Sequence, residues 1–236
     1  MNIPYVEDSK REEKYREMER LGQELKVPVP GAFLQIEVFD GQANRIHAHR
    51  QRSHSWNRNA YNWFFTMATT TKVLGSSFSD GNLTARTTNG EVRSGDFNMF
   101  SYDVPAYLAS AGISNYGIVV GSGSEVEDFN GYKLSSLIAN GTGAGQLTYQ
   151  IGGSPSVTWD APSLTFSANW VRYFNNNSGG DISINEVGLV GHFHIAFAYT
   201  STLYVLVSRD VLASTLNVPD TGQLKVTYTI NMTYPE

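Results

Sequence analysis

Apolar and polar residues alternate along most of the second half of the chain. Apolar side chains occupy every second position in runs at residues 147–151, 164–170, 182–184, 203–207 and 224–232. A period of two is typical of a strand that packs one face on a core and turns the other to water. Many such strands without helices between them predict a mainly β protein, an antiparallel β-sandwich or jelly-roll-like domain.

The last of these runs gives the most explicit prediction. It follows a turn at residues 219–222, and polar Lys, Thr and Asn residues separate its apolar positions. We expect the apolar side chains to face the core and the polar ones to stay exposed. The predicted core positions are Leu224, Val226, Tyr228, Ile230 and Met232.

The first half of the body predicts shorter elements and one helix. An apolar run at residues 32–39, a turn and a second run at 44–49 indicate a pair of strands. Residues 56–74 repeat their apolar side chains at spacings of three and four, which indicates one packed helix. Residues 75–114 are polar and rich in turn formers, so we expect loops with short strands there.

Residues 1–31 differ from the rest. More than half of residues 7–26 are charged, with acids and bases three and four apart, which favours a solvated helix. Its thin apolar stripe suits a helix laid along a neighbour, either this domain or another subunit; an unpartnered surface helix is the alternative. Prolines then end the helix, so the chain divides into a charged helix with a Pro-rich linker, 1–31, and a β-sandwich domain, 32–236. The stripe is Tyr15, Met18, Leu21 and Leu25.

Composition narrows the function classes. The formal net charge of −5 disfavours a nucleic-acid binder, which needs clustered Lys and Arg. No run of 18 apolar residues is present, so no transmembrane helix is expected, and the charged N-terminus does not resemble a secretion signal. The chain has no cysteine, which excludes disulfides and thiolate metal sites.

One basic stretch stands out at residues 45–58. We interpret it as a protein–protein contact that meets acidic residues on an adjoining subunit; a solvated face and a contact with nucleic acid are the alternatives. Arg50, Arg52 and Arg58 are its candidate contact residues, together with the apolar stripe of the N-terminal helix.

The sequence contains few residue patterns typical of catalytic or metal-binding sites. His47 with His49, and His192 with His194, could each turn two imidazoles to one face of a strand. A metal site of this type also needs a carboxylate and another histidine nearby, and no acid follows His194 in residues 195–200. The acids at residues 125–128 match no calcium loop and are interpreted as a solvated loop. No nucleophile-elbow or phosphate-loop sequence appears. We therefore predict no catalytic residue, no metal site and no cofactor.

Several passages together resemble a known family. Residues 118–123 (IVVGSG), with Leu134, Leu137 and Ile138 after them, match an apolar strand followed by Gly-polar-Gly and Leu-x-x-Leu-Ile. Residues 185–189 (NEVGL) and 208–212 (SRDVL) follow in order. This order is similar to that of structural virion proteins of tailed bacteriophages.

Two further passages extend the resemblance over residues 50–233. The ending at residues 216–230 (LNVPDTGQLKVTYTI) and the passage at 53–59 (SHSWNRN), before the predicted helix, are also similar to the phage proteins. The charged N-terminal helix lies outside the pattern.

The resemblance implies a non-catalytic component of a tailed-phage particle at the head, neck/collar or tail. Such a protein binds copies of itself and other virion proteins, has no membrane partner, and is assembled into the virion in the host cytoplasm. The resemblance does not indicate which position it takes in the particle. The alternative is a carbohydrate-binding or metal-dependent protein on a jelly roll, in which aromatic side chains would stack on sugars or the histidine pairs would hold a metal.

Overall fold

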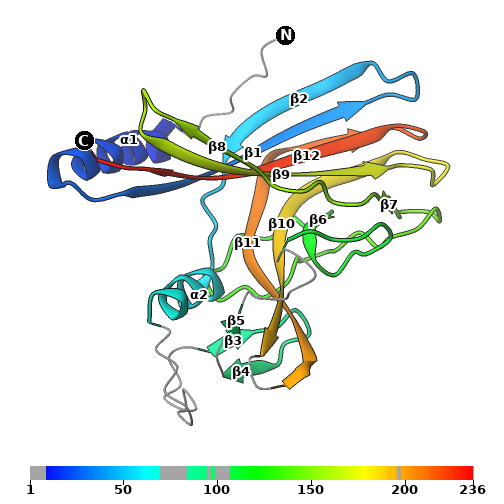
Figure 1. Cartoon of the computed structure of the whole chain (residues 1–236). Coiled ribbons are helices and arrows are strands. Elements are labelled where there is room, and N and C mark those ends of the chain that lie inside the picture. Colours follow the sequence, from blue (N-terminus) through cyan, green and yellow to red (C-terminus); the bar gives the residue numbers. More distant parts are fainter. Residues whose placement is uncertain (1–8, 70–83, 95–96, 99–106, 196–197, 236) are drawn as a thin grey trace.

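The computed structural model describes residues 9–69, 84–94, 97–98, 107–195 and 198–235. Strands make up most of the regular structure of the described residues, helices are few, and the sheets are antiparallel. Two sheets share one continuous hydrophobic core, and their strands cross at a steep angle (Figure 1). The predicted mainly β, sandwich-like class is confirmed.

Sheet A is the larger of the two. Its strands lie in the order β2-β1-β12-β9-β7, and β8 pairs with β9 on the same side as β7. Because β1 and β12 are central neighbours, the two ends of the chain meet in this sheet. The strands are β1 (Val29–Phe39), β2 (Arg45–Arg52), β7 (Thr148–Tyr149), β8 (Ser156–Asp160), β9 (Thr165–Asn175) and β12 (Gln223–Thr233).

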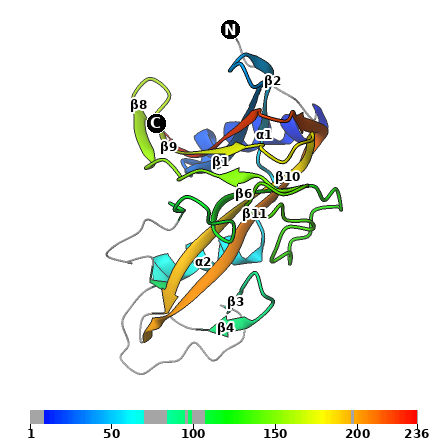
Figure 2. The same cartoon turned by 90° about the vertical axis from the view of Figure 1, so that its right-hand side faces the viewer.

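Sheet B is built around the long hairpin of β10 and β11. Strand β10 pairs with β11 on one side and with β5 and β6 on the other. The hairpin extends away from sheet A beside α2, as Figure 2 also shows. The strands are β5 (Phe97–Asn98), β6 (Gly117–Gly121), β10 (Ile182–Ile195) and β11 (Ala198–Val218), and β3 (Thr84–Arg86) and β4 (Val92–Ser94) form a separate pair.

Two helices flank the sheets. Helix α1 (Ser9–Leu25) lies beside sheet A, and α2 (Arg58–Thr69) packs near β11 and β3. The helix predicted at 56–74 begins two residues later than expected, and its residues 70–74 lie outside the described part of the chain. Neither described helix is long and apolar enough to cross a membrane.

Sequence-based strand limits were close to those observed. Strand β1 begins at Val29, inside the predicted linker, because the backbone of residues 29–31 pairs with the end of β12. Strand β2 continues to Arg52, three residues beyond the predicted limit. Ile151 does not continue a strand; it is exposed in the loop after β7, where the chain turns away from sheet A.

The final strand shows where the core lies. Leu224, Val226 and Tyr228 are fully buried, as predicted, whereas Ile230 and Met232 are only half-buried. The pairing with β1 places all five on the inner face of sheet A. Val226 lies beside Ile36 and Tyr228 beside Leu34, and the other three lie beside further even-numbered residues of β1. Sheet B covers one end of that inner face and leaves the other end less covered.

The less covered end carries exposed apolar side chains, which we call the overhang: Val157 and Trp159 of β8 and Phe166 of β9. These residues are 55%, 47% and 43% exposed. They lie on the same face as Val226, because β8 and β12 pair with β9 in matching register. Sheet A therefore presents an apolar surface to its surroundings at this end.

A buried arginine fixes the loop that precedes β6. Arg172 of β9 is 1% exposed and donates to five backbone carbonyl oxygens at 2.6–3.2 Å. Burial lowers its pKa to about 10, so the guanidinium is still charged at neutral pH. Since a planar guanidinium has five N–H donors, its hydrogen-bonding capacity is largely used here. The accepting residues are Ser110, Ile113, Tyr116, Ile118 and Gln150.

A second buried charge joins β10 to β11. Glu186 is fully buried, accepts from Arg209 Nε at 2.5 Å, and also accepts from the backbone N–H groups of Ser135 (3.1 Å) and Ser136 (2.7 Å). The loop after β6 is therefore held against the hairpin. A Cβ at Gly121 would lie 2.4 Å from the Glu186 carboxylate, so this close approach requires glycine.

We predict that Val226→Asp lowers the free energy of unfolding by about 3 kcal/mol, because it buries a carboxylate without a partner. Chemical denaturation of the purified chain measures the change. Thr227→Asp is the matched control, since the next residue along faces away from the core and should change stability by less than about 1 kcal/mol. An equal free energy of unfolding for Val226→Asp and the wild type would show that the register of β12 is wrong.

Candidate functional site

The candidate site is built on the segment that joins β2 to α2. This link, residues 53–57, runs beside β11: the Asn57 N–H donates to the Val207 carbonyl (3.2 Å), and the Arg209 N–H donates to the Ser55 carbonyl (3.5 Å). Figure 1 shows the link passing from sheet A toward α2. Its side chains therefore lie at the junction of the two sheets.

A fully buried carboxylate, Asp210 of β11, organises the link. Its Oδ2 accepts from the hydroxyls of Ser53 (2.7 Å) and Ser208 (2.9 Å). Its Oδ1 accepts from the Ser55 hydroxyl (2.8 Å) and the His54 backbone N–H (3.1 Å). Burial raises the pKa of Asp210, although the hydrogen bonds from Ser53 and Ser55 oppose the rise. Each carboxylate oxygen thus has two donors from the chain itself.

Tyr228 of β12 extends this network. Its hydroxyl lies 2.6 Å from the Ser53 hydroxyl and accepts from the Trp56 indole N–H at 3.1 Å. Because Ser53 donates its proton to Asp210, the Tyr228 hydroxyl donates to Ser53. An activated serine nucleophile needs a neighbouring base that can remove its proton during the reaction, usually a histidine. Here the serine hydroxyls are used to satisfy a buried carboxylate.

His54 connects the link to the loop after β6. Its Nε2 lies 3.0 Å from Glu127 Oε2, and its Nδ1 lies 3.3 Å from the Arg52 carbonyl oxygen. Both ring nitrogens face acceptors, so the geometry favours the doubly protonated imidazolium. Burial disfavours that charge, but the hydrogen bond and charge of Glu127 outweigh it and raise the pKa of His54.

Glu127 is held from two sides. Its Oε1 accepts from the Val211 backbone N–H at 3.0 Å, while Oε2 meets His54. Burial raises the pKa of this carboxyl, but the hydrogen bonds from His54 and Val211 together lower it below 4.5. The two groups therefore form a partly buried ion pair at mildly acidic pH, between the ordinary pKa values of the two side chains.

This ion pair predicts a pH dependence of stability. The His54 contribution is complete below its unfolded pKa of 6.5 and is lost as pH rises through the higher folded value. The Glu127 contribution is present above 4.5 and is lost as pH falls through the lower folded value. The ion pair therefore stabilises the fold most between about pH 4.5 and pH 6.5, the ordinary pKa values of Glu127 and His54.

We expect His54→Gln to cost about 1 kcal/mol at about pH 5.5 and distinctly less at about pH 8.5. Urea denaturation of wild type and variant at both pH values measures the difference, so that titration of other groups cancels. A cost that does not change between the two pH values would contradict the ion pair.

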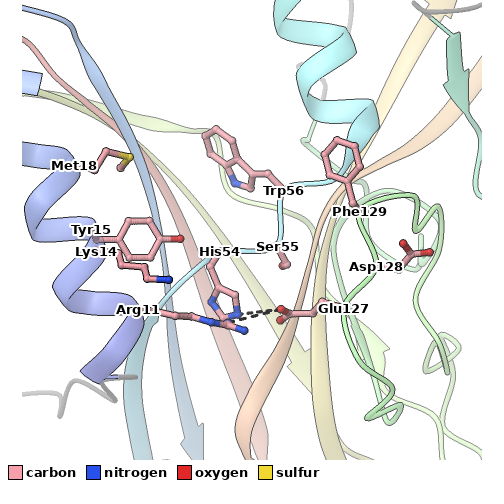
Figure 3. Close-up of a pocket in the computed structure, with 10 residues that line it drawn as sticks. All are labelled: Arg11, Lys14, Tyr15, Met18, His54, Ser55, Trp56, Glu127, Asp128 and Phe129. Carbon is pink, nitrogen blue, oxygen red and sulfur yellow. Dashed lines mark ion pairs between the residues drawn. The ribbon is translucent and has the colours of Figure 1, made fainter. Parts of the chain in front are cut away.

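Helix α1 closes a groove over this network, as Figure 3 shows. The groove has a volume of about 440 Å³, and a neighbouring hollow of about 330 Å³ lies on the side of Gln51 and Val211. Its walls combine aromatic and charged side chains, so it could accept a partner's side chain or a small polar molecule. The lining residues are Arg11, Lys14, Tyr15, Met18, His54, Ser55, Trp56, Glu127, Asp128 and Phe129.

One arginine attaches α1 to sheet A. The Arg52 guanidinium makes a bidentate ion pair with Glu12 (2.8 and 3.0 Å) and a further contact with Glu19 (3.0 Å). It also lies over the Tyr15 ring, 4.6 Å from its centre. Farther along the helix, Gln23 donates to the Tyr234 carbonyl at 3.3 Å. Helix α1 therefore lies along this domain, and a contact of its apolar stripe with another subunit stays a prediction.

Two carboxylates and one imidazole of the network are close enough together to be considered as metal ligands. One ligand atom from each of His54, Glu127 and Asp210 lies within 4.8 Å of the other two. However, both Asp210 oxygens already accept two hydrogen bonds, and both His54 nitrogens face acceptors. A metal needs a free lone pair on each ligand. The donor set therefore fits an ion-pair network better than a metal centre.

The other predicted contact residues are more exposed. Met18 and Leu21 are each 38% exposed and Leu25 is 67% exposed, so only Tyr15 of the stripe is half-buried. Arg50 is exposed over the Phe33 ring at 4.1 Å, and Arg58 lies over the Phe129 ring at 5.7 Å. The structure thus brings Tyr15 and Arg52 together, places Met18 at the groove, and leaves Leu21, Leu25 and Arg50 away from it.

Much of the basic stretch meets acids of the same chain. Arg45 pairs with Glu37 (3.1 Å), in addition to the pairs that Arg52 and His54 make. The prediction of acidic partners on an adjoining subunit therefore applies only to Arg50 and Arg58, and it stays a prediction.

The predicted histidine pairs take different environments. His47 Nε2 lies 3.2 Å from His49 Nδ1, and His49 is buried with its pKa lowered to about 4 by burial and by His47. The His192 ring packs against both Tyr116 and Tyr204, at 4.9 and 5.6 Å between ring centres, and these two tyrosine rings stack on each other. The side chain of His194 lies outside the described residues.

Sequence reasoning did not single out His54, Glu127 and Asp210 as a group. His54 and Asp210 stand in two passages of the family resemblance, and Glu127 was grouped only with its neighbouring acids. One feature of the sequence could have indicated this network. The polar residues Ser208, Arg209 and Asp210 interrupt an apolar run that predicts a buried strand, and buried polar residues need hydrogen-bond partners elsewhere in the chain.

Comparison with known protein families, curated proteins and solved structures finds no match to this chain.

Proposed function

We propose that this chain is a non-catalytic structural component of a tailed-phage particle, at the head, neck/collar or tail, that contacts copies of itself and other virion proteins. One observation carries the proposal: the described groups best suited to chemistry are paired within the chain, while apolar side chains face outward. His54, Glu127 and Asp210 hydrogen-bond to protein partners, and α1 and the overhang expose Leu25 and Trp159.

The fold indicates what the passages that resemble phage virion proteins do in this structure. Its NEVGL and SRDVL passages supply Glu186 and Arg209, and its Gly-Ser-Gly passage lets the loop after β6 approach that ion pair. These shared passages thus support a rigid β framework. A framework of this kind suits a protein whose role is shape and repeated contacts, because weak contacts gain strength from symmetry.

Helix α1 offers the first contact surface. Arg52 attaches its first half, while Met18, Leu21 and Leu25 remain exposed beside a shallow hollow of the same helix. Exposed apolar residues on a charged helix favour contact with another protein. Arg50 and Arg58 would form the polar rim of such contacts.

Deletion of residues 1–26 tests this surface. We expect a folded, soluble domain that incorporates poorly into particles or oligomers, because Glu12 and Tyr15 of α1 contact Arg52 of sheet A from outside its core. The double variant Met18→Ser/Leu21→Ser should reproduce the loss with α1 still attached, and Arg20→Ser on the exposed face is its control. Particle incorporation during phage growth is the measurement. Normal incorporation of the deletion would make α1 a solvated surface helix, and unfolding would make it part of the core.

One observation favours the alternative, a carbohydrate-binding or metal-dependent protein: the groove combines Trp56, Tyr15 and Phe129 with charged residues. Light scattering and a metal assay on the same purified sample separate the two functions. Oligomers without stoichiometric metal support the structural role; a monomer that retains metal, and loses it in Asp210→Asn, supports the alternative.

A further inference from the structure

Strand β8 forms an open edge of sheet A. It pairs with β9 alone in the described part of the chain, and all five of its residues are exposed. Figure 2 shows the β8–β9 hairpin projecting at one side of the molecule. Proteins usually protect such an edge with charged residues, a bulge or a covering segment. The sequence of β8, SVTWD, has one charge, at its last residue, and consists otherwise of Ser and the good strand formers Val, Thr and Trp.

The backbone groups that face outward can be identified. Residues 150 and 153 donate to the carbonyls of Tyr173 and Val171, so the odd-numbered residues of β9 direct their backbone groups toward the side where β8 lies. Ser156, Thr158 and Asp160 pair with odd-numbered residues of β9. Because backbone groups alternate along an antiparallel strand, the N–H and C=O of Val157 and Trp159 face the open edge.

This edge is complementary to itself. If two copies pair antiparallel about a two-fold axis at Thr158, Val157 lies opposite Trp159 of the second copy, and the outward backbone groups of both residues form hydrogen-bonded pairs. Aromatic and β-branched side chains directly opposite each other stabilise a sheet. The single charge, Asp160, then lies opposite Ser156, so no like charges oppose each other.

We propose that β8 pairs with β8 of a second copy and joins two sheets A into one continuous sheet. This inference rests on the proposed function, since it names one of the symmetric contacts. The pairing brings the overhangs of both copies, with Val157, Trp159 and Phe166, onto the same face of the joined sheet. A five-residue edge buries less than a standard stable interface, so the contact is weak alone and gains strength from avidity in an assembly.

A cysteine crosslink tests the register. The chain has no cysteine, so Thr158→Cys introduces a single thiol. In the proposed pair the two Cα atoms lie about 4.5 Å apart, within disulfide range. Ser156→Cys is the matched control, because its two copies lie roughly 13 Å apart. Under mild oxidation Thr158→Cys should form a covalent dimer and Ser156→Cys should not. No dimer from Thr158→Cys, or equal yields from both, would overturn the pairing.

A proline at the open edge tests the hydrogen bonds. Val157→Pro removes an N–H that faces outward and leaves the pairing with β9 intact, since edge strands tolerate proline at such positions. We expect it to abolish the Thr158→Cys crosslink and to weaken self-association at least about tenfold. Val157→Thr keeps the N–H and should crosslink normally. If the chain is present in particles but Val157→Pro has no effect on the crosslink, this inference fails and the proposed function stands; if the chain crosslinks through β8 but is absent from particles, the reverse holds.

Discussion

Arg172→Met is expected to lower the free energy of unfolding by about 4 kcal/mol or more. The side chain is buried and donates to carbonyl groups on both sides of the loop before β6, from Ser110 to Ile118. Methionine fills part of the space and donates nothing, so several buried carbonyls lose their partner, and each loss costs about 1–3 kcal/mol before relaxation. Guanidinium chloride denaturation of the purified chain measures the change.

Two further variants give this prediction its controls. Arg172→Lys keeps the charge but has three donors in place of five, so it should destabilise less than methionine and still measurably. Tyr173→Met changes the next residue, which is on the exposed face, and should shift stability by less than about 1 kcal/mol. Equal stability of Arg172→Met and Tyr173→Met would contradict the loop-fixing role.

Glu186→Gln is expected to cost about 3–5 kcal/mol, because it removes the buried counter-charge of the Arg209 guanidinium and leaves only the exposed Glu125 carboxylate, 3.9 Å away. The same carboxylate also accepts from the backbone of Ser135 and Ser136, so the loop after β6 should become more accessible. Denaturation gives the stability change. Hydrogen exchange at residues 122–136 reports the loop, with faster exchange expected in the variant.

A double-mutant cycle isolates the pair. In Glu186→Gln/Arg209→Met the second change should cost much less than it does in the wild type, because the charge that it removes has already lost its close, buried partner. We expect a coupling energy of about 2 kcal/mol. Additive costs would show that the two residues act separately.

Periodicity predicted the fold class because the core of this protein lies on alternating strand positions. Val226 and Tyr228 are buried as the pattern required. The same rule placed Ile230 and Phe166 in the core, where the structure leaves them half-buried and 43% exposed. Periodicity reports which face a side chain lies on, and it carries no information on how far a second sheet covers that face.

The polar network was less predictable for a related reason. Asp210 meets Ser53 over a separation of 157 residues, and Arg52 meets Glu12 over 40. Such contacts depend on which strands become neighbours, and local pattern does not encode that choice. The family resemblance included the passages that hold Ser53 and Asp210, but their contact depends on residues 53–57 lying beside β11.

The proposed function makes this chain part of a phage particle. Quantitative mass spectrometry of purified, nuclease-treated particles of a tailed phage whose genome carries the gene for this chain tests this proposal most directly. We predict that the chain copurifies with the particles at a fixed ratio to the major head or tail protein, as expected for a symmetric component. Abundant chain in the infected-cell lysate, with none retained in the purified particles, would contradict the claim.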